Sequence, residues 1–264
     1  MSSFQHIRHL DIVKVEFNTF IDFVQLVRSF PVLETLSVSL LQWQPSILKI
    51  DYSAYQLRRP IRMRLVDLLE KSAADVAHWL LAHNPTPRID TLHFETNKPE
   101  SNKIMHQLIM ACGPSINELK FELAFASETE AHLEDSIGIR NCVNLQHLHL
   151  HNIILFSGYP MTGAITRRVP VLLSQVTSTQ IREVVFTVLI CQKEHLDLLN
   201  WESVTEILSG PRFANLMTVR VRVPGSVVTF DRAEVARQLR EDKLSVFHGR
   251  GMVVLEFPGA LGAY

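Results

Sequence analysis

The chain has 264 residues, 47% of them hydrophobic, and its 26 basic and 27 acidic residues give a net charge of −1. A chain of this length can bury a sizeable core, and its balanced charge gives no reason to expect a nucleic acid or a membrane surface as partner. Its three widely spaced cysteines, without a C-x-x-C pair, are typical of reduced thiols in an intracellular protein, either cytoplasmic or nuclear.

A hydrophobic pattern of the form L-x-x-L-x-L occurs nine times along the chain. The clearest copy is NLQHLHLHN, with Leu145, Leu148 and Leu150. The middle apolar positions of the copies are, in chain order, Leu10, Leu36, Met63, Leu92, Leu119, Leu148, Val184, Val219 and Leu255, spaced 26 to 36 residues apart. The copy formed by Pro60, Met63 and Leu65 fits the pattern least well. Because apolar and polar residues alternate within each copy, we expect nine short strands.

The segments between these copies have the spacing and punctuation of helices. We expect helices over residues 17–30, 72–83, 102–112, 162–176, 201–208 and 231–240. Asn18 is a candidate cap for the first helix, and Pro or Gly follows most of the others. Pro170 is expected to break or kink the helix over residues 162–176, because proline lacks a backbone donor.

A single unit of one strand and one helix cannot bury its own apolar side. Stacking nine such units predicts an α/β solenoid that forms a single domain over residues 1–264. In this architecture a curved parallel sheet lines the concave side and the helices cover the convex side. Repeat architectures of this kind usually serve as binding surfaces and not as enzymes.

The repeats resemble the leucine-rich repeat family over nearly the whole chain. The phrases FPVLETLSVSLLQW, NCVNLQHLHLHNI and GRGMVVLEF are similar to the irregular repeats of fungal F-box-like proteins. The resemblance implies a non-catalytic protein-interaction domain, specifically the substrate-recognition part of an F-box-type ubiquitin ligase. It also implies that a ubiquitin-ligase adaptor binds through an N-terminal module.

Two departures from that family stand out. The standard repeat places Asn or Cys three residues after the last Leu of the strand, where this chain has Val15 in the first unit and Ile153 in the sixth. The turns must therefore satisfy their backbone groups differently. In addition, no LP-x-E segment of an F-box and no capping domain is visible. The adaptor-binding module is expected to lie outside this chain, which would then be a fragment or have an end that a partner covers.

Side chains that alternate with the core positions are expected on the concave face, where they would contact a protein or peptide partner. The candidate partner-binding residues are Arg62, Arg64, His93, Glu95, Glu118, Lys120, Glu122, His147, His149, His151, Glu183, Arg220 and Arg222. The alternative interpretation of this set is an ordinary solvated face. The sequence leaves the identity of the partner and the oligomeric state open.

Three histidines in one strand form the most distinctive local motif. His147, His149 and His151 alternate and therefore share a face, but neighbours on that face lie about 7 Å apart along a strand. That spacing is too wide for three imidazoles to converge on one metal ion, so we expect a row that contacts a partner, and neither a metal nor a cofactor. The pairs Arg62/Arg64 and Arg220/Arg222 could bind phosphate or an acidic peptide. Trp43 is expected to be the most exposed tryptophan.

Motifs of catalysis are not found. The sequence contains no G-x-S-x-G, no G-x-x-x-x-G-K-[ST] and no H-E-x-x-H, so we expect that the protein is not an enzyme. Two alternatives remain open. One is an open α/β-sheet enzyme of unknown reaction, which requires catalytic side chains that converge in one crevice. The other is a degenerate structural repeat fragment without a ligand.

Overall fold

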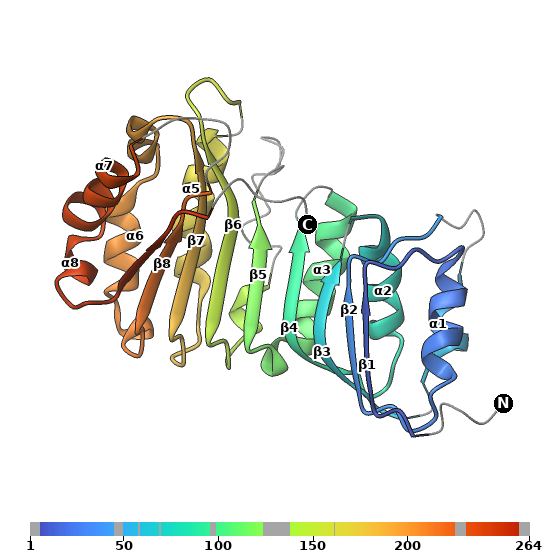
Figure 1. The fold of residues 1–264 in the computed structure, drawn as a ribbon. Coiled ribbons are helices and arrows are strands. Elements are labelled where there is room, and N and C mark those ends of the chain that lie inside the picture. Colours follow the sequence, from blue (N-terminus) through green and yellow to red (C-terminus); the bar gives the residue numbers. More distant parts are fainter. Residues whose placement is uncertain are drawn as a thin grey trace.

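The computed structural model describes residues 6–44, 50–57, 59–68, 70–95, 99–123, 138–160, 162–224 and 231–258. Nine strands form one sheet in the order in which they occur in the chain (Figure 1). Every neighbouring pair of strands is parallel. The strands are β1 (His9–Val13), β2 (Thr35–Ser39), β3 (Arg62–Leu68), β4 (Arg88–Glu95), β5 (Glu118–Glu122), β6 (His147–Leu155), β7 (Glu183–Ile190), β8 (Thr218–Arg222) and β9 (Val253–Glu256). The expected α/β class with a parallel sheet is confirmed.

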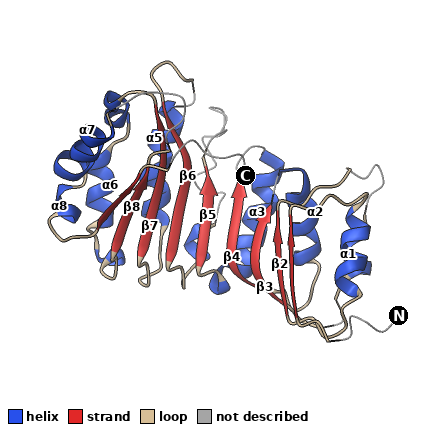
Figure 2. Ribbon diagram, viewed as in Figure 1, coloured by secondary structure: helices blue, strands red, loops and turns tan. Residues whose placement is uncertain are grey.

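Helices connect most of the strands and pack on one face of the sheet, as Figure 2 shows by colour. The helices are α1 (Phe20–Arg28), α2 (Glu70–Leu81), α3 (Pro99–Cys112), α5 (Thr162–Gln175), α6 (Trp201–Leu208), α7 (Arg232–Arg237) and α8 (Ser245–His248). Short 3-10 turns are η1 (Tyr52–Tyr55), η2 (Gly113–Ser115), η3 (Ile139–Asn141), η4 (Lys193–Leu198) and η5 (Pro211–Phe213), and the π-helical turn η6 spans Gln238–Lys243. None of the helices in the described ranges is long and apolar enough to span a bilayer.

The core consists of apolar rows that cross the sheet beneath the helices. In register across neighbouring strands, Val66, Leu92, Leu119, Leu148, Val184 and Val219 form one such row, and each of them is completely buried. The last strand differs, because Val253 and Leu255 continue the rows but remain half-exposed. Side chains that alternate with these rows, such as Thr91 and Lys120, lie on the face without helices, which we call the open face.

The register between β2 and β3 differs from the one predicted from the sequence. Leu36 of β2 lies opposite Met63, but the next residue, Ser37, lies opposite Leu65. The bulge therefore leaves Arg64 as an extra residue in β3. Beyond the bulge Val66 is the core position, and Val66 and Leu68 lie in register with Leu92 and Phe94 of β4.

Beyond the bulge the open face carries Leu65 and Asp67 where the sequence pattern suggested Arg64. Arg62 precedes the bulge at the start of β3, in register with Thr35 of β2, and its Nε donates a 2.7 Å hydrogen bond to Asp90. Arg62 and Arg64 are both exposed. The placement of Arg64 in the charged rows was wrong, because one inserted residue reverses the alternation of side chains.

The turns after the strands satisfy their backbone without an Asn or Cys ladder. In the first unit Lys14 N donates to Ser39 O over 3.0 Å, and Gln42 N donates to Val15 O over 3.1 Å. In the fifth unit Leu123 N likewise donates to His151 O of the next unit over 3.0 Å. Carbonyl groups of neighbouring units thus replace the missing side-chain acceptors.

The first helix begins one residue later than the candidate cap suggested. Thr19, and not Asn18, is the N-cap: its hydroxyl accepts from Asp22 N over 3.2 Å, while Asp22 Oδ2 accepts from Thr19 N over 3.0 Å. This reciprocal capping box satisfies two free backbone donors.

Further along the chain, helix α5 continues through Pro170 from Thr162 to Gln175, so the expected break is absent. Buried Val169, Leu172 and Leu173 anchor the helix on both sides of the proline.

Replacing Thr19 with alanine is expected to lower the free energy of unfolding by about 1 kcal/mol, because it removes the acceptor for Asp22 N and half of the capping box. Urea unfolding followed by circular dichroism measures this change. Asn18→Ala is the matched control and should have little effect. Equal losses in the two variants would contradict the assignment of the cap.

An aromatic cluster closes the N-terminal end of the core. Trp43 packs on Phe20 and Phe23 with ring centroids 5.5 and 5.8 Å away. Its Nε1 donates to Asp75 Oδ2 over 2.7 Å, and the Tyr52 hydroxyl donates to Asp75 Oδ1 over 2.5 Å. The expectation of an exposed Trp43 was wrong, since only 4% of its surface is accessible. Burial and the Asp75 carboxylate raise the pKa of Tyr52.

Candidate functional site

Three rows of side chains run across the open face of the sheet. The first row comprises Leu65, Thr91, Glu118, His147, Glu183 and Thr218. The second comprises Asp67, His93, Lys120, His149, Val185 and Arg220. The third comprises Glu122, His151, Thr187, Arg222 and Glu256. Because neighbouring strands lie about 4.8 Å apart, side chains within a row can interact directly.

Three histidines from two strands come together near the centre of these rows. The ring of His151 lies 5.8 Å from that of His149 and 5.9 Å from that of His93, measured between centroids. We call His93, His149 and His151 the histidine cluster. His93 reaches over the intervening strand β5 and belongs to the cluster in place of His147, which lies 3.4 Å from Glu183.

Carboxylates hold one side of the histidine cluster. His93 Nδ1 lies 2.8 Å from Asp67 Oδ1, and Asp67 Oδ2 accepts a 2.7 Å hydrogen bond from the Ser39 hydroxyl. Glu118 lies 3.7 Å from His149 Nε2 and 3.3 Å from the Lys120 ammonium group. Burial alone would raise the pKa of Asp67, but the hydrogen bond and charge of His93 outweigh it and hold that pKa below its usual range.

The other ring nitrogens of the cluster lack hydrogen-bond partners. His93 Nε2, His149 Nδ1 and His151 Nε2 are buried and have no partner in the described part of the chain. Burial lowers the pKa of His149 to about 4. Burial, reinforced by His93, His149, Lys120 and Arg222, lowers the pKa of His151 to about 3. Both rings are therefore neutral at physiological pH, and each offers hydrogen-bonding capacity that the fold itself leaves unused.

A chain of ion pairs extends from the cluster toward the last strand. Arg220 Nε donates to Glu183 over 2.9 Å, and its Nη1 donates to Glu256. Arg222 Nε donates to the second oxygen of Glu256 over 2.7 Å. Although burial opposes ionisation, these guanidinium groups lower the pKa of both carboxyl groups below the usual range. The pairs fix the directions of four long side chains on a rigid sheet.

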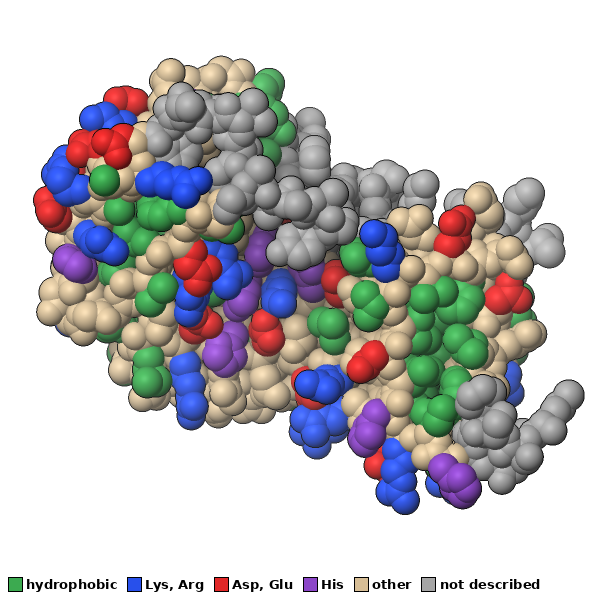
Figure 3. All heavy atoms as spheres, viewed as in Figure 1, with side chains coloured by type: hydrophobic (Ala, Val, Ile, Leu, Met, Phe, Trp, Pro, Cys, Tyr) green, Lys and Arg blue, Asp and Glu red, His purple; other side chains and the backbone are tan. Residues whose placement is uncertain are grey.

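Figure 3 shows the result on the surface, where histidines lie among side chains of both charges over the central strands. Surface regions with one sign of charge favour nucleic acids or anionic membranes. Here acidic and basic groups alternate instead. This arrangement suits a partner whose own surface carries both signs.

Metal-binding geometry and thiol reactivity are two further chemical properties of the described residues. Among them, no group of three His, Cys, Asp or Glu side chains is arranged to hold a metal ion. Burial raises the pKa of the Cys112 and Cys142 thiols to about 12, so neither is a thiolate nucleophile at neutral pH. What the open face can do chemically is donate and accept hydrogen bonds and pair charges.

The structure brings together most of the residues proposed from the sequence. His93, His149 and His151 form the cluster next to Glu118 and Lys120, whereas Arg220 and Arg222 join Glu183 in the ion-pair chain. The backbone of Glu95 lies in register with Glu122. Asp67 was missed. The pattern Met63-x-x-Val66-x-Leu68, which fits the repeat better than Pro60, Met63 and Leu65, was the signal that could have revealed Asp67.

No protein-family model, no curated protein and no solved structure matches this chain. A functional assignment therefore depends on the geometry of the chain itself.

Proposed function

We propose that this chain is a non-catalytic interaction module, a leucine-rich-repeat solenoid that binds a protein partner on the open, concave face of its sheet. The histidine cluster and the ion-pair chain form the centre of that binding surface. The observation that carries the proposal is the cluster of three imidazole rings on the open face, flanked by charged side chains. The His93 side chain is 26% exposed and that of His149 11%, so a partner would contact these ring edges and the charged groups beside them.

Protein is the partner class that the electrostatics favour. Each acidic side chain of the ion-pair chain is matched by a guanidinium group, so the face presents alternating signs to a partner. Such a pattern gives orientation and specificity to protein–protein contacts. A nucleic acid would instead require many cations free to neutralise phosphates.

The likeness to repeats of F-box-like proteins suggests a more specific form of this proposal. In that form the open face selects the protein that an F-box-type ubiquitin ligase modifies, and an adaptor-binding module joins the face to the ligase. Recovery of ubiquitin-ligase subunits together with the partner would support this form.

Affinity capture with variants of the open face tests the binding module. The tagged chain would be compared with a Lys120→Glu/Arg222→Glu variant in lysate from its own source. A partner captured by the native chain is expected to bind the variant at least about 10-fold more weakly, since two charge contacts are reversed. The affinity would be measured by titration with the purified partner.

Arg140→Glu/Arg167→Glu is the matched control, because it reverses the same number of charges at exposed positions outside the open face. Thermal unfolding must show that both variants remain folded. If the control loses the partner and the open-face variant retains it, another surface carries the binding and the proposal is wrong.

A further inference from the structure

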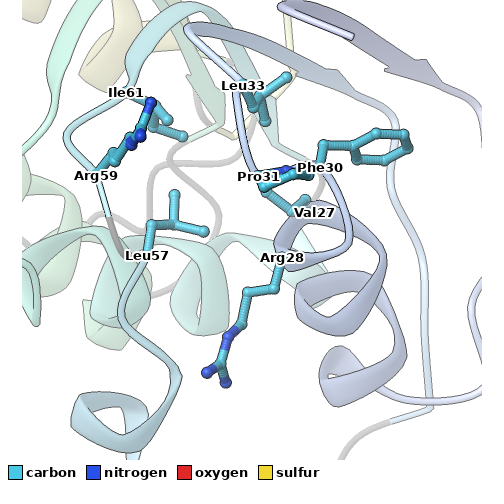
Figure 4. A pocket seen from close by; sticks show the side chains of 8 residues that line it. All are labelled: Val27, Arg28, Phe30, Pro31, Leu33, Leu57, Arg59 and Ile61. Carbon is cyan, nitrogen blue, oxygen red and sulfur yellow. The ribbon is translucent and has the colours of Figure 1, made fainter. Parts of the chain in front are cut away.

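A second candidate site lies away from the charged rows, beside the C-terminal end of α1. Figure 4 shows a hollow of about 150 Å³ between the segment that joins α1 to β2 and the segment that joins η1 to β3. It is lined by Val27, Arg28, Phe30, Pro31, Leu33, Leu57, Arg59 and Ile61. Six of these eight residues have apolar side chains, and Leu57 faces Val27 and Pro31 across the hollow.

An interruption of the helix layer explains why the hollow exists. Between β2 and β3 the described chain forms only the four-residue turn η1, whereas the connections that hold α2, α3, α5 and α6 contain helices of eight to fourteen residues. The thin layer at η1 leaves a hollow next to the buried side chains of Phe30 and Leu33. A void of this kind costs stability unless something fills it.

At a comparable place farther along the chain, an arginine satisfies the end of a helix. Where the end of α5 meets the segment between α6 and β8, Arg212 donates to the carbonyl groups of Ser174 and Val176 over 2.8 and 3.2 Å. Phe213 is buried beside it. A hollow of about 220 Å³ remains at that place, but its arginine is held by the two carbonyl groups.

The two arginines at the hollow beside α1 do not bind the end of a helix in this way. Arg28 and Arg59 form no hydrogen bond or ion pair with any described residue. They extend on opposite sides of the apolar side chains. None of the eight described side chains that line the hollow is acidic. The site therefore combines apolar side chains with two positive charges that no described residue pairs.

We propose that this hollow, which we call the Arg28/Arg59 pocket, binds a segment of a partner protein that inserts one leucine or aromatic side chain and presents a carboxylate beside it. A cavity of about 150 Å³ accommodates a group the size of benzene, which excludes a lipid chain. Carboxylates pair strongly with guanidinium groups, so an acidic residue on either side of the inserted side chain would meet an arginine. This site is separate from the open face and does not depend on its function.

Nuclear magnetic resonance with designed probes tests the proposal. The acidic peptide Ac-Asp-Phe-Asp-NH2 is expected to shift the backbone amide signals of residues 27–33 and 57–61. The neutral peptide Ac-Asn-Phe-Asn-NH2 has the same shape and should bind about 5- to 10-fold more weakly, because it lacks the ion pairs. Ac-Asp-Ala-Asp-NH2, without the ring, should not bind.

Two variants separate the role of charge from that of shape. Arg28→Gln/Arg59→Gln should abolish the preference for the acidic peptide, whereas Leu57→Trp should fill the pocket and block both peptides. Arg167→Gln, on the exposed side of α5, is the matched control and should retain the preference. Equal binding of the acidic and neutral peptides to the native chain would overturn the proposal, as would shifts confined to other residues or no shifts at millimolar peptide.

Discussion

Replacing Phe186 with alanine is expected to lower the free energy of unfolding by about 3–5 kcal/mol. Phe186 is completely buried in the central strand β7. It lies in register with Leu150 of β6 and Val221 of β8, and its ring meets Trp201 of α6 at a centroid distance of 6.0 Å. The side chain therefore joins the sheet to the helix layer, and close packing on all sides prevents collapse around the void.

Urea unfolding followed by tryptophan fluorescence measures the Phe186→Ala change. Met217→Ala is the control, because Met217 is 67% exposed, and its effect should stay within about 0.5 kcal/mol. A loss below 1 kcal/mol for Phe186→Ala would mean that the strand–helix contact does not hold the core together.

The second large expected effect is a loss of stability at acid pH that is caused by the histidine cluster. The folded-state pKa values of His149 and His151 are lowered to about 4 and about 3, from 6.5. Above pH 6.5 both imidazoles are neutral in the folded and in the unfolded chain, so their protonation does not affect stability. As the pH falls below 6.5 the unfolded chain takes up protons that the folded chain does not, so stability is lost progressively toward the folded-state values.

By pH 4 this difference is expected to cost about 3 kcal/mol per histidine. Unfolding free energies measured between pH 8 and pH 4 should therefore fall less steeply in a His149→Gln/His151→Gln variant than in the native chain. The control is His248→Gln, at an exposed position on α8. Parallel pH profiles for the native chain and the double variant would contradict the burial of neutral imidazoles.

Much of the sheet could be predicted from sequence because its repeat is local. All nine expected strands form, since alternation within five residues determines which side chains face the core. Strand β3 was misaligned because its bulge inserts one residue, and the sequence pattern offered two ways to place Met63. That single residue decides whether Arg64 or Asp67 lies in the charged rows.

The histidine cluster could be predicted only in part. Residues His149 and His151 alternate within one strand, which makes their shared face visible in the sequence. The approach of His93 depends on the register of three strands and on the orientation of its side chain over β5, which is fixed by Asp67. The burial of Trp43 likewise depends on Asp75, 32 residues away, which accepts its indole hydrogen bond.

The strict sequential order of the strands also has a consequence for how the chain folds. Every strand pairs with the strand next to it in the sequence, so no contact of the sheet requires the closure of a loop much longer than one unit. The entropic cost of forming each pair is similar along the chain, and folding can nucleate at any well-packed pair and spread in both directions. The half-exposed edge at β9 is then a natural end point of that growth, and the central strands, with neighbours on both sides, are the regions where it is most favourable to begin.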